Sequence, residues 1–161
     1  MNALGARLYL PAKQFFKLAN DAKVMAILVG GGASRLNGSN RFTKDLDINV
    51  SSFSFLKSYK GDDFLIRQGS SRRMMVVTYK STDRDLSVRC DVGLHTDIER
   101  LLPYTKVDEA SGISWDSPKM PQELKHLLLS KDVVDAFWQQ IRSNHPDQGN
   151  FLDAFVRPII E

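Results

Sequence analysis

Two segments with alternating apolar and polar residues constrain the fold of this chain more than any other feature. In the first, Leu46, Ile48 and Val50 are separated by polar residues, and the segment 86–93 repeats the pattern. A period of two places apolar side chains on one face of a strand and polar side chains on the other. Both segments therefore predict strands of a sheet that is buried on one face and polar on the other.

Carboxylates occupy the polar face of the first segment. Asp45 and Asp47 are two residues apart, so their side chains point to the same face, with Cα atoms separated by roughly 6.6 Å. Like charges this close repel each other unless a cation lies between them, and Mg²⁺ prefers carboxylate oxygens as ligands. The pair therefore indicates either a metal site or two acids on a solvated strand.

A third carboxylate, Asp91, lies at a polar position of the second segment. Val88, Cys90 and Val92 around it indicate a central strand, in which an unpaired carboxylate is costly. If the two strands are neighbours, Asp91 converges with the first two carboxylates on a site for two cations about 3.5–4 Å apart. Cations at this spacing stabilise the attacking and leaving oxygens of phosphoryl transfer.

A run of three glycines follows an apolar segment. The residues from Val24 to Val29 predict a buried strand, the glycines at 30–32 predict a turn, and 33–36 has room for one helical turn. Glycines let the backbone approach a ligand closely, and N–H groups at a helix start can hold phosphate. The segment is therefore either a phosphate-binding turn or only a tight turn.

The pattern of the whole chain predicts an α+β fold, with a small mixed sheet first and helices afterwards. A helix is expected from Pro11, and a second around 53–59. Strands are expected at 64–67 and 74–79, joined by a turn. The rest is expected to be mainly helical, with helices at 96–102, 121–130, 132–141 and 151–156.

Length and composition fit a single domain over 1–161, with a core at about 10–104 and a helical C-terminal part at about 116–161. The 42% hydrophobic and 25% charged fractions are typical of globular proteins. The net charge of +3 permits a phosphate-bearing partner but is far below that of a dedicated nucleic-acid binder. No apolar run approaches the roughly 20 residues that span a bilayer. We therefore expect a soluble, cytoplasmic protein with no membrane partner.

The segment from Gly30 to Val50, GGGASRLNGSNRFTKDLDINV, resembles the signature of the nucleotidyltransferase superfamily. In that family a Gly-Gly or Gly-Ser turn is followed by Asp-x-Asp on a strand, and a third acid comes from a further strand. The run from Arg41 to Ile48 is especially similar to the minimal nucleotidyltransferases of the AbiEii/AbiGii toxin–antitoxin type. Asp91 falls where the third acid is expected. The resemblance covers about 24–94.

The resemblance implies transfer of a nucleoside monophosphate from a nucleoside triphosphate to an acceptor hydroxyl, with release of pyrophosphate. Asp45 and Asp47 would bind two Mg²⁺ ions, or Mn²⁺ in their place, and Asp91 would bind one ion and help to activate the acceptor. The acceptor would be RNA, protein or a small molecule. The residues implied to hold the β- and γ-phosphates are Gly31, Gly32 and Ser34.

Basic residues flank the acids. Arg41 and Lys44 lie just before Asp45, and either contact a phosphate or pair with its carboxylate. A basic stretch between the second and third acids either neutralises the triphosphate, guides an RNA acceptor or is a solvated hairpin. This stretch contains Arg67, Arg72, Arg73, Lys80, Arg84 and Arg89.

Two alternatives to an active enzyme stay open. Members of the AbiEii/AbiGii type often continue into a larger helical domain, and in the short C-terminal part only Lys125, His126 and Lys131 are candidates for its polar residues. A non-catalytic protein that binds a nucleotide or a partner on the same fold is therefore one alternative. An unrelated Asp-x-Asp protein, such as a nucleotide-sugar transferase, is the other, but it would leave the glycine run unexplained.

Overall fold

The computed structural model describes residues 2–40, 42–80 and 87–117, together with 139 and 143. Among these residues, none of the helices combines the length and the apolar character needed to cross a membrane. Several sequence predictions fall outside the described residues. These are the helices beyond 117 and the candidate residues Arg41, Arg84, Lys125, His126 and Lys131.

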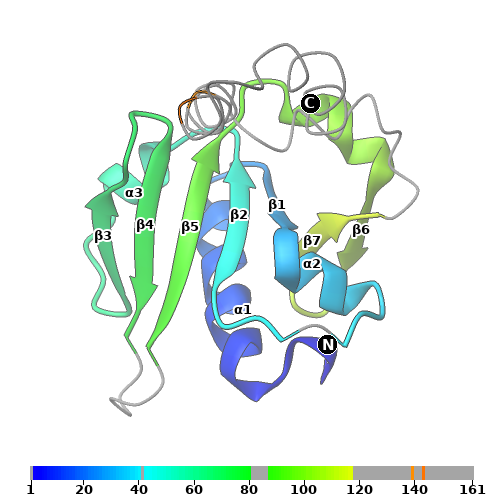
Figure 1. The fold of residues 1–161 in the computed structure, drawn as a ribbon. Helices are drawn as coiled ribbons and strands as arrows, with labels where there is room; N and C mark the ends of the chain where they lie inside the picture. Colours follow the sequence, from blue (N-terminus) through cyan, green and yellow to red (C-terminus); the bar gives the residue numbers. More distant parts are fainter. Residues whose placement is uncertain (1, 41, 81–86, 118–138, 140–142, 144–161) are drawn as a thin grey trace.

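The described residues form one seven-stranded mixed sheet with helices packed on it (Figure 1). In chain order the elements are η1 (Asn2–Leu4), α1 (Ala6–Asp21), β1 (Ala26–Val29), α2 (Gly30–Leu36), β2 (Leu46–Val50), α3 (Ser54–Lys57), β3 (Phe64–Gln68), β4 (Met74–Tyr79), β5 (Val88–Leu94), η3 (Ile98–Tyr104), β6 (Thr105–Asp108) and β7 (Ile113–Asp116).

The strands are arranged in the order β3-β4-β5-β2-β1-β7-β6. The pairs β2–β5 and β1–β7 are parallel, and the other neighbours are antiparallel. Strand β5 lies between β4 and β2. The strand of Asp91 is therefore central, as its apolar flanks predict, and it is adjacent to the strand of Asp47. The predicted α+β class with a mixed sheet is also confirmed.

Helix α1 covers one face of this sheet. Its Phe15 makes edge-to-face contacts with Phe16, Phe55 and Phe64, at centroid distances of 6.2, 5.8 and 6.3 Å. The apolar positions of the two alternating strands point into the same core, which includes the fully buried Ile48. Burial of each large apolar side chain contributes about 1.5–3 kcal/mol. The helix begins at Ala6, so Pro11 lies inside it and the prediction of Pro11 in the first turn is wrong.

The opposite face of the sheet has a smaller apolar cluster. Ile27 and Val29 of β1 pack there against Ile98 and Leu101 of η3. Because side chains alternate along β2 and β5, their polar residues lie on this face as well. The arrangement leaves polar groups beside the small cluster, while the main core fills the other face.

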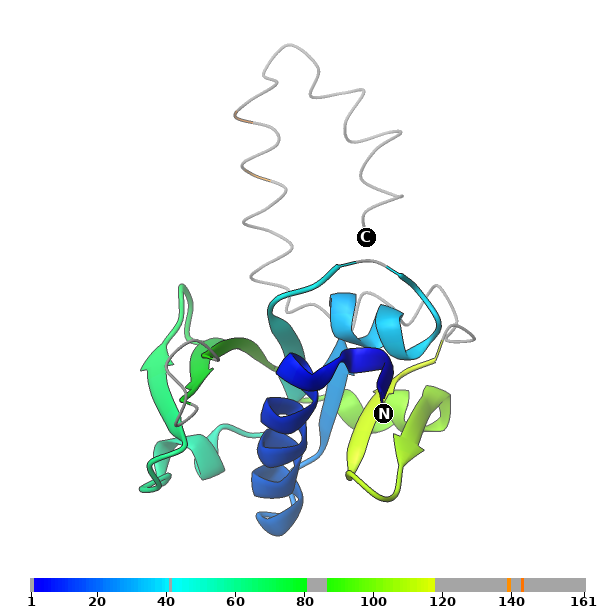
Figure 2. The ribbon, with the colours of Figure 1, turned by 90° about the horizontal axis from the view of Figure 1, so that it is seen from below.

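The hairpin β6–β7 is missing from the sequence-based prediction, which treats the chain beyond 96 as mainly helical. Strand β7 pairs in parallel with β1 through Leu28 and Trp115, and so extends the sheet past β1. Figures 1 and 2 place this hairpin and the β3–β4 hairpin at opposite ends of the sheet. Strands β6 and β7 have only four residues each, too few for a clear alternation of apolar and polar residues. Pairing with the rest of the sheet decides their structure.

Candidate active site

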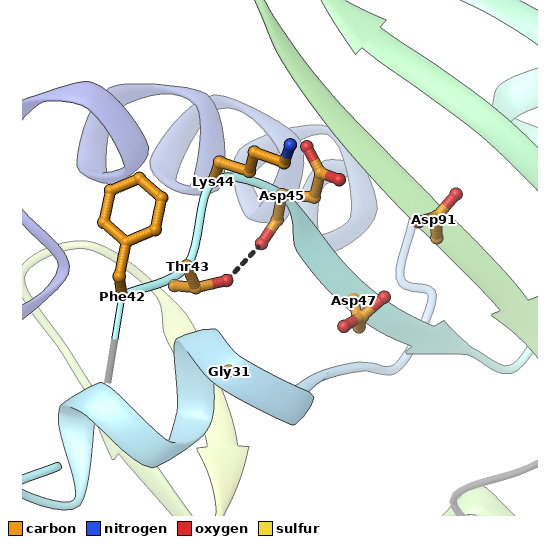
Figure 3. A pocket seen from close by; sticks show the side chains of 7 residues that line it. All are labelled: Gly31, Phe42, Thr43, Lys44, Asp45, Asp47 and Asp91. Atoms are coloured by element: carbon orange, nitrogen blue, oxygen red, sulfur yellow. Dashed lines mark hydrogen bonds between the residues drawn. The ribbon is translucent and has the colours of Figure 1, made fainter. Parts of the chain in front are cut away.

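Three carboxylates meet at one pocket on the polar side of β2 and β5. Asp47 of β2 is paired in register with Asp91 of β5, and Asp45 immediately precedes β2. The pocket is open, has a volume of about 490 Å³, and is seen from close by in Figure 3. The predicted convergence of the three acids is thus confirmed. The full lining consists of Gly31, Phe42, Thr43, Lys44, Asp45, Asp47 and Asp91.

Asp47 is partly buried and lies close to the negative charges of the other two acids. Burial raises its pKa, and the negative charges of Asp91 and Asp45 raise it further, while the positive charge of Arg89 lowers it. The repulsion expected from the spacing of the acids is therefore present in the folded protein. A cation bound between the carboxylates would relieve it.

The first glycine of the run makes room for Asp47. Gly30 has φ +64°, a left-handed conformation that costs an L-residue about 1–2 kcal/mol. A Cβ atom at this position would lie 2.5 Å from Oδ2 of Asp47. Helix α2 begins at Gly30, so the glycines form its first turn, and the predicted turn before a helix at 33–36 is wrong. Gly30 allows the helix to start directly beside the carboxylate.

The other two glycines have different neighbours. A Cβ atom on Gly31 would lie 2.7 Å from Oγ1 of Thr43, whose hydroxyl donates a 3.1 Å hydrogen bond to the carbonyl oxygen of Asp45. Gly31 thereby lets the loop before β2 close over the helix start. Gly32 is buried, and a Cβ atom there would lie 3.2 Å from a methyl group of Leu28. Its small size serves the packing of α2 on β1.

The predicted nucleotide-binding residues are not all brought together. Gly31 and Lys44 line the pocket. Gly32, in the first turn of α2, faces Leu28 of β1. Ser34 lies further along α2, and its carbonyl oxygen accepts hydrogen bonds from the N–H groups of Asn37 and Ser39. Among the described residues, the pocket lining therefore includes one of the three residues predicted to hold phosphate.

An ion pair next to the pocket is absent from the sequence-based prediction. Nε of Arg89 donates a 2.8 Å hydrogen bond to Oδ1 of Asp91, and the two side chains are 55% and 26% exposed. The hydrogen bond to Asp91 and the negative charge of Asp91 raise the pKa of Arg89. The negative charges of Asp45 and Asp47 raise it further. The two residues are two positions apart on β5, so the alternation that places Asp91 on the polar face also places Arg89 there.

Phe42 is a second residue that the sequence-based prediction omits. Its side chain is 76% exposed and lines the pocket from the loop before β2 (Figure 3). A large apolar side chain with this exposure gains little from burial in the protein itself. Its exposure depends on the path of the loop, which no local pattern reveals.

The side chains of the pocket provide ligand atoms of the kind that bind divalent cations. Three carboxylates offer the hard oxygen ligands that Mg²⁺ and Mn²⁺ prefer. Burial and, after it, the negative charges of Asp91 and Asp45 raise the pKa of Asp47, and a cation would neutralise those charges. Among the described residues, however, no three His, Cys, Asp or Glu side chains are arranged to hold one ion. Loading of a metal would therefore require the carboxylates to reorient, including Asp91, which is paired with Arg89.

Comparison with known proteins adds information at the level of the fold. No family model and no curated protein sequence matches this chain. The fold is similar to the crystal structure of an antigenic nucleotidyltransferase-like protein from Paracoccidioides brasiliensis, with a TM-score of 0.53 and 14% sequence identity. The match covers 93% of this chain and 94% of that one. At this level of identity the match shows the fold alone, and it does not test the narrower resemblance to the AbiEii/AbiGii type. The chain has a nucleotidyltransferase-like fold.

Proposed function

We propose that this protein is a nucleotidyltransferase that uses a divalent cation to transfer a nucleoside monophosphate from a nucleoside triphosphate to an acceptor hydroxyl. One observation carries the proposal: Asp47 and Asp91 are paired on adjacent parallel strands, and Asp45 lines the same pocket, on a nucleotidyltransferase-like fold. The acceptor class stays open among RNA, protein and small molecules.

In the proposed reaction the acceptor oxygen forms a bond to the α-phosphorus. The bond from that phosphorus to the α,β-bridging oxygen breaks, and its electron pair leaves with pyrophosphate. Asp91 accepts the proton of the acceptor hydroxyl, since it is paired with Asp47 on the neighbouring strand and lines the same open pocket. Positioning and charge neutralisation supply most of the rate, as is usual for phosphoryl transfer.

In this proposal Asp45 and Asp47 would hold Mg²⁺, with Mn²⁺ as a substitute, and Asp91 would share one of two ions. Ions held there would supply positive charge against the triphosphate and against the attacking and leaving oxygens. A bound cation would also stabilise the ionised form of Asp47, whose pKa is raised by burial and by the negative charges of Asp91 and Asp45. Reorientation of the carboxylates on loading is part of the proposal, since no three such side chains in the described part of the chain are arranged to hold one ion.

The pocket lining provides groups for the rest of the nucleotide. The backbone at Gly31 and the ammonium group of Lys44 lie at the same pocket and would contact the phosphates. Phe42, with a 76% exposed ring, offers a surface on which a nucleobase stacks. A single aromatic surface favours stacking over hydrogen-bonded readout, so we expect weak discrimination among the four bases at this position.

A non-catalytic binding protein is the second candidate. It is favoured by the ion pair between Arg89 and Asp91, which occupies the proposed proton acceptor, and by the lack of a closed carboxylate cluster among the described residues. Such a protein would bind a nucleotide in the same pocket without turnover. An unrelated Asp-x-Asp protein is disfavoured by the nucleotidyltransferase-like fold.

The test is incubation of the protein with each labelled nucleoside triphosphate and Mg²⁺, in the presence of RNA, protein and small-molecule acceptors. We expect pyrophosphate release and a mass increase of one nucleoside monophosphate in one acceptor fraction. Asp62→Asn, which removes an exposed carboxylate in the loop before β3, serves as a matched control and should retain the activity. Tight triphosphate binding without pyrophosphate release from any acceptor would favour the binding protein instead.

A further inference from the structure

Arg89 lies where three negative charges meet. It donates its 2.8 Å hydrogen bond to Asp91 of the same strand. In the parallel register of β2 and β5, Leu46 is opposite Cys90, so Asp45 and Arg89 are the next positions along the two strands. The guanidinium group is therefore near the carboxylates on both strands, and the charges of Asp45 and Asp47 act on it as well.

We propose that Arg89 is the built-in counter-ion of the carboxylate pocket, and that it moves from Asp91 to a phosphate group of the substrate when a divalent cation binds Asp91. This inference rests on the proposed function and deepens it. It assigns a positioning role to a residue that neither holds the cation nor exchanges a proton.

The ion pair is suited to such an exchange. The Arg89 side chain is 55% exposed, and ion pairs with this degree of exposure contribute little to stability, so separation of the pair costs little. The bond to Asp91 uses Nε, whereas a guanidinium group has five N–H donors in a planar fork. The remaining donors match the oxygens of a phosphate group, which the fork binds in a bidentate manner.

The same ion pair acts on both of the paired acids. Arg89 contacts Asp91 directly, at 2.8 Å between Nε and Oδ1. The positive charge of Arg89 also lowers the pKa of Asp47, against the effects of burial and of the other two acids. The positive charge of Arg89 thus offsets part of the negative charge of the carboxylates.

Exchange of this kind couples the binding of the cation to the binding of phosphate. A cation that binds Asp91 without a phosphate must displace Arg89 and leave the guanidinium group without its partner. A cation that arrives with a polyphosphate gives the group a new partner. The two ligands should therefore bind more tightly together than separately, and each should raise the affinity of the other by the same factor.

The test compares Arg89→Gln with wild type, using Mn²⁺ alone and then inorganic tripolyphosphate at saturating Mn²⁺. Mn²⁺ binding is measured by electron paramagnetic resonance, and tripolyphosphate binding by calorimetry. For Arg89→Gln we expect Mn²⁺ alone to bind about 2- to 5-fold more tightly, because a competing positive charge is gone. Tripolyphosphate should bind about 10-fold more weakly, because a charge-assisted contact is lost.

Two further variants sharpen the result. Lys106→Gln makes the same change of charge on β6, at the far edge of the sheet, and should alter neither affinity. Arg89→Lys keeps the charge but loses the planar fork. It should leave the Mn²⁺ affinity near that of wild type while tripolyphosphate binds more weakly.

The opposite movement of the two affinities is the decisive feature. If Arg89→Gln weakens the binding of both ligands, or leaves Mn²⁺ affinity unchanged, Arg89 has only a structural role and the inference is wrong. If wild type does not bind Mn²⁺ with or without tripolyphosphate, the proposed metal-dependent function fails along with it. The two failures are therefore distinguished by the wild-type titration alone.

Discussion

The two faces of strands β2 and β5 are built from alternate residues of the same segments and have opposite properties. On the α1 side, Ile48 and Cys90 are fully buried in the core around Phe15. On the other side, Asp47 and Asp91 lie side by side at an open pocket. The comparison shows that the buried face stabilises strands whose polar face carries repelling charges. Stability and the proposed chemistry should therefore respond to different substitutions.

The largest effect is expected from Asp91→Asn on the polar face. Loss of a proton acceptor and metal ligand should lower the rate of transfer by a factor on the order of 10²–10⁴. Binding of the triphosphate should be largely retained, because Asp45 and Asp47 still hold one ion on the phosphates. The measurements are pyrophosphate release and triphosphate titration. Equal loss of binding and of rate would mean that Asp91 acts through the nucleotide site and not on the acceptor.

A comparably large effect, but on stability, is expected from Phe15→Ala on the buried face. This side chain is fully buried and contacts three other aromatic rings, so its truncation should cost about 3–5 kcal/mol of unfolding free energy. Denaturant unfolding measures the change. A loss below about 1 kcal/mol would contradict the view that the α1 face provides the main core.

Phe42→Ala should lower triphosphate affinity and leave stability nearly unchanged, the opposite of what is expected for Phe15→Ala. Because the ring is 76% exposed, the unfolding free energy should change by no more than about 0.5 kcal/mol. Triphosphate affinity should fall by about 1–3 kcal/mol if a base stacks on the ring. Val107→Ala, at another exposed apolar residue on β6, is the control. Unchanged nucleotide affinity in Phe42→Ala would place the base elsewhere.

The smallest effect is expected from Asp47→Asn in the metal-free protein. The folded state raises the pKa of Asp47, so its contribution to stability is present below the ordinary pKa of 3.8 and is lost as the pH rises through the raised pKa. An asparagine stays neutral at every pH. The variant should therefore melt at a higher temperature than wild type at neutral pH, and this gain should shrink as the pH falls towards 3.8.

Asp47→Asn also distinguishes Mg²⁺-dependent nucleotide binding from effects on folding. In wild type, a triphosphate with Mg²⁺ should raise the melting temperature, and it should do so much less with a chelator present, because ligand binding stabilises the native state by mass action. The variant should lose the Mg²⁺-dependent part of this shift. A full shift in the variant would show that the nucleotide binds independently of the carboxylates.

Local patterns were sufficient for much of the sheet and for the three acids of the pocket. A period of two is a property of the extended chain itself, so Leu46, Ile48 and Val50 indicate the buried face of β2 without any knowledge of its neighbours. The same pattern also places Arg89 on the face of Asp91, although its ion pair was not inferred. The helix start at Gly30 could not be inferred, because the glycine is required by a contact with Asp47, seventeen positions later in the chain, and not by the turn alone.

The sequence by itself determined the strands from β1 to β5, which of their faces are polar and which acids are available, because these depend on the spacing of neighbouring residues. Tertiary structure alone decided that β5 lies next to β2 in parallel and in a register that pairs Asp91 with Asp47. It also decided that β6–β7 extends the sheet and that Phe42 stays exposed at the pocket. These features depend on contacts between segments far apart in the chain. Such contacts are set by packing of the whole sheet against α1 and η3, which no local pattern encodes.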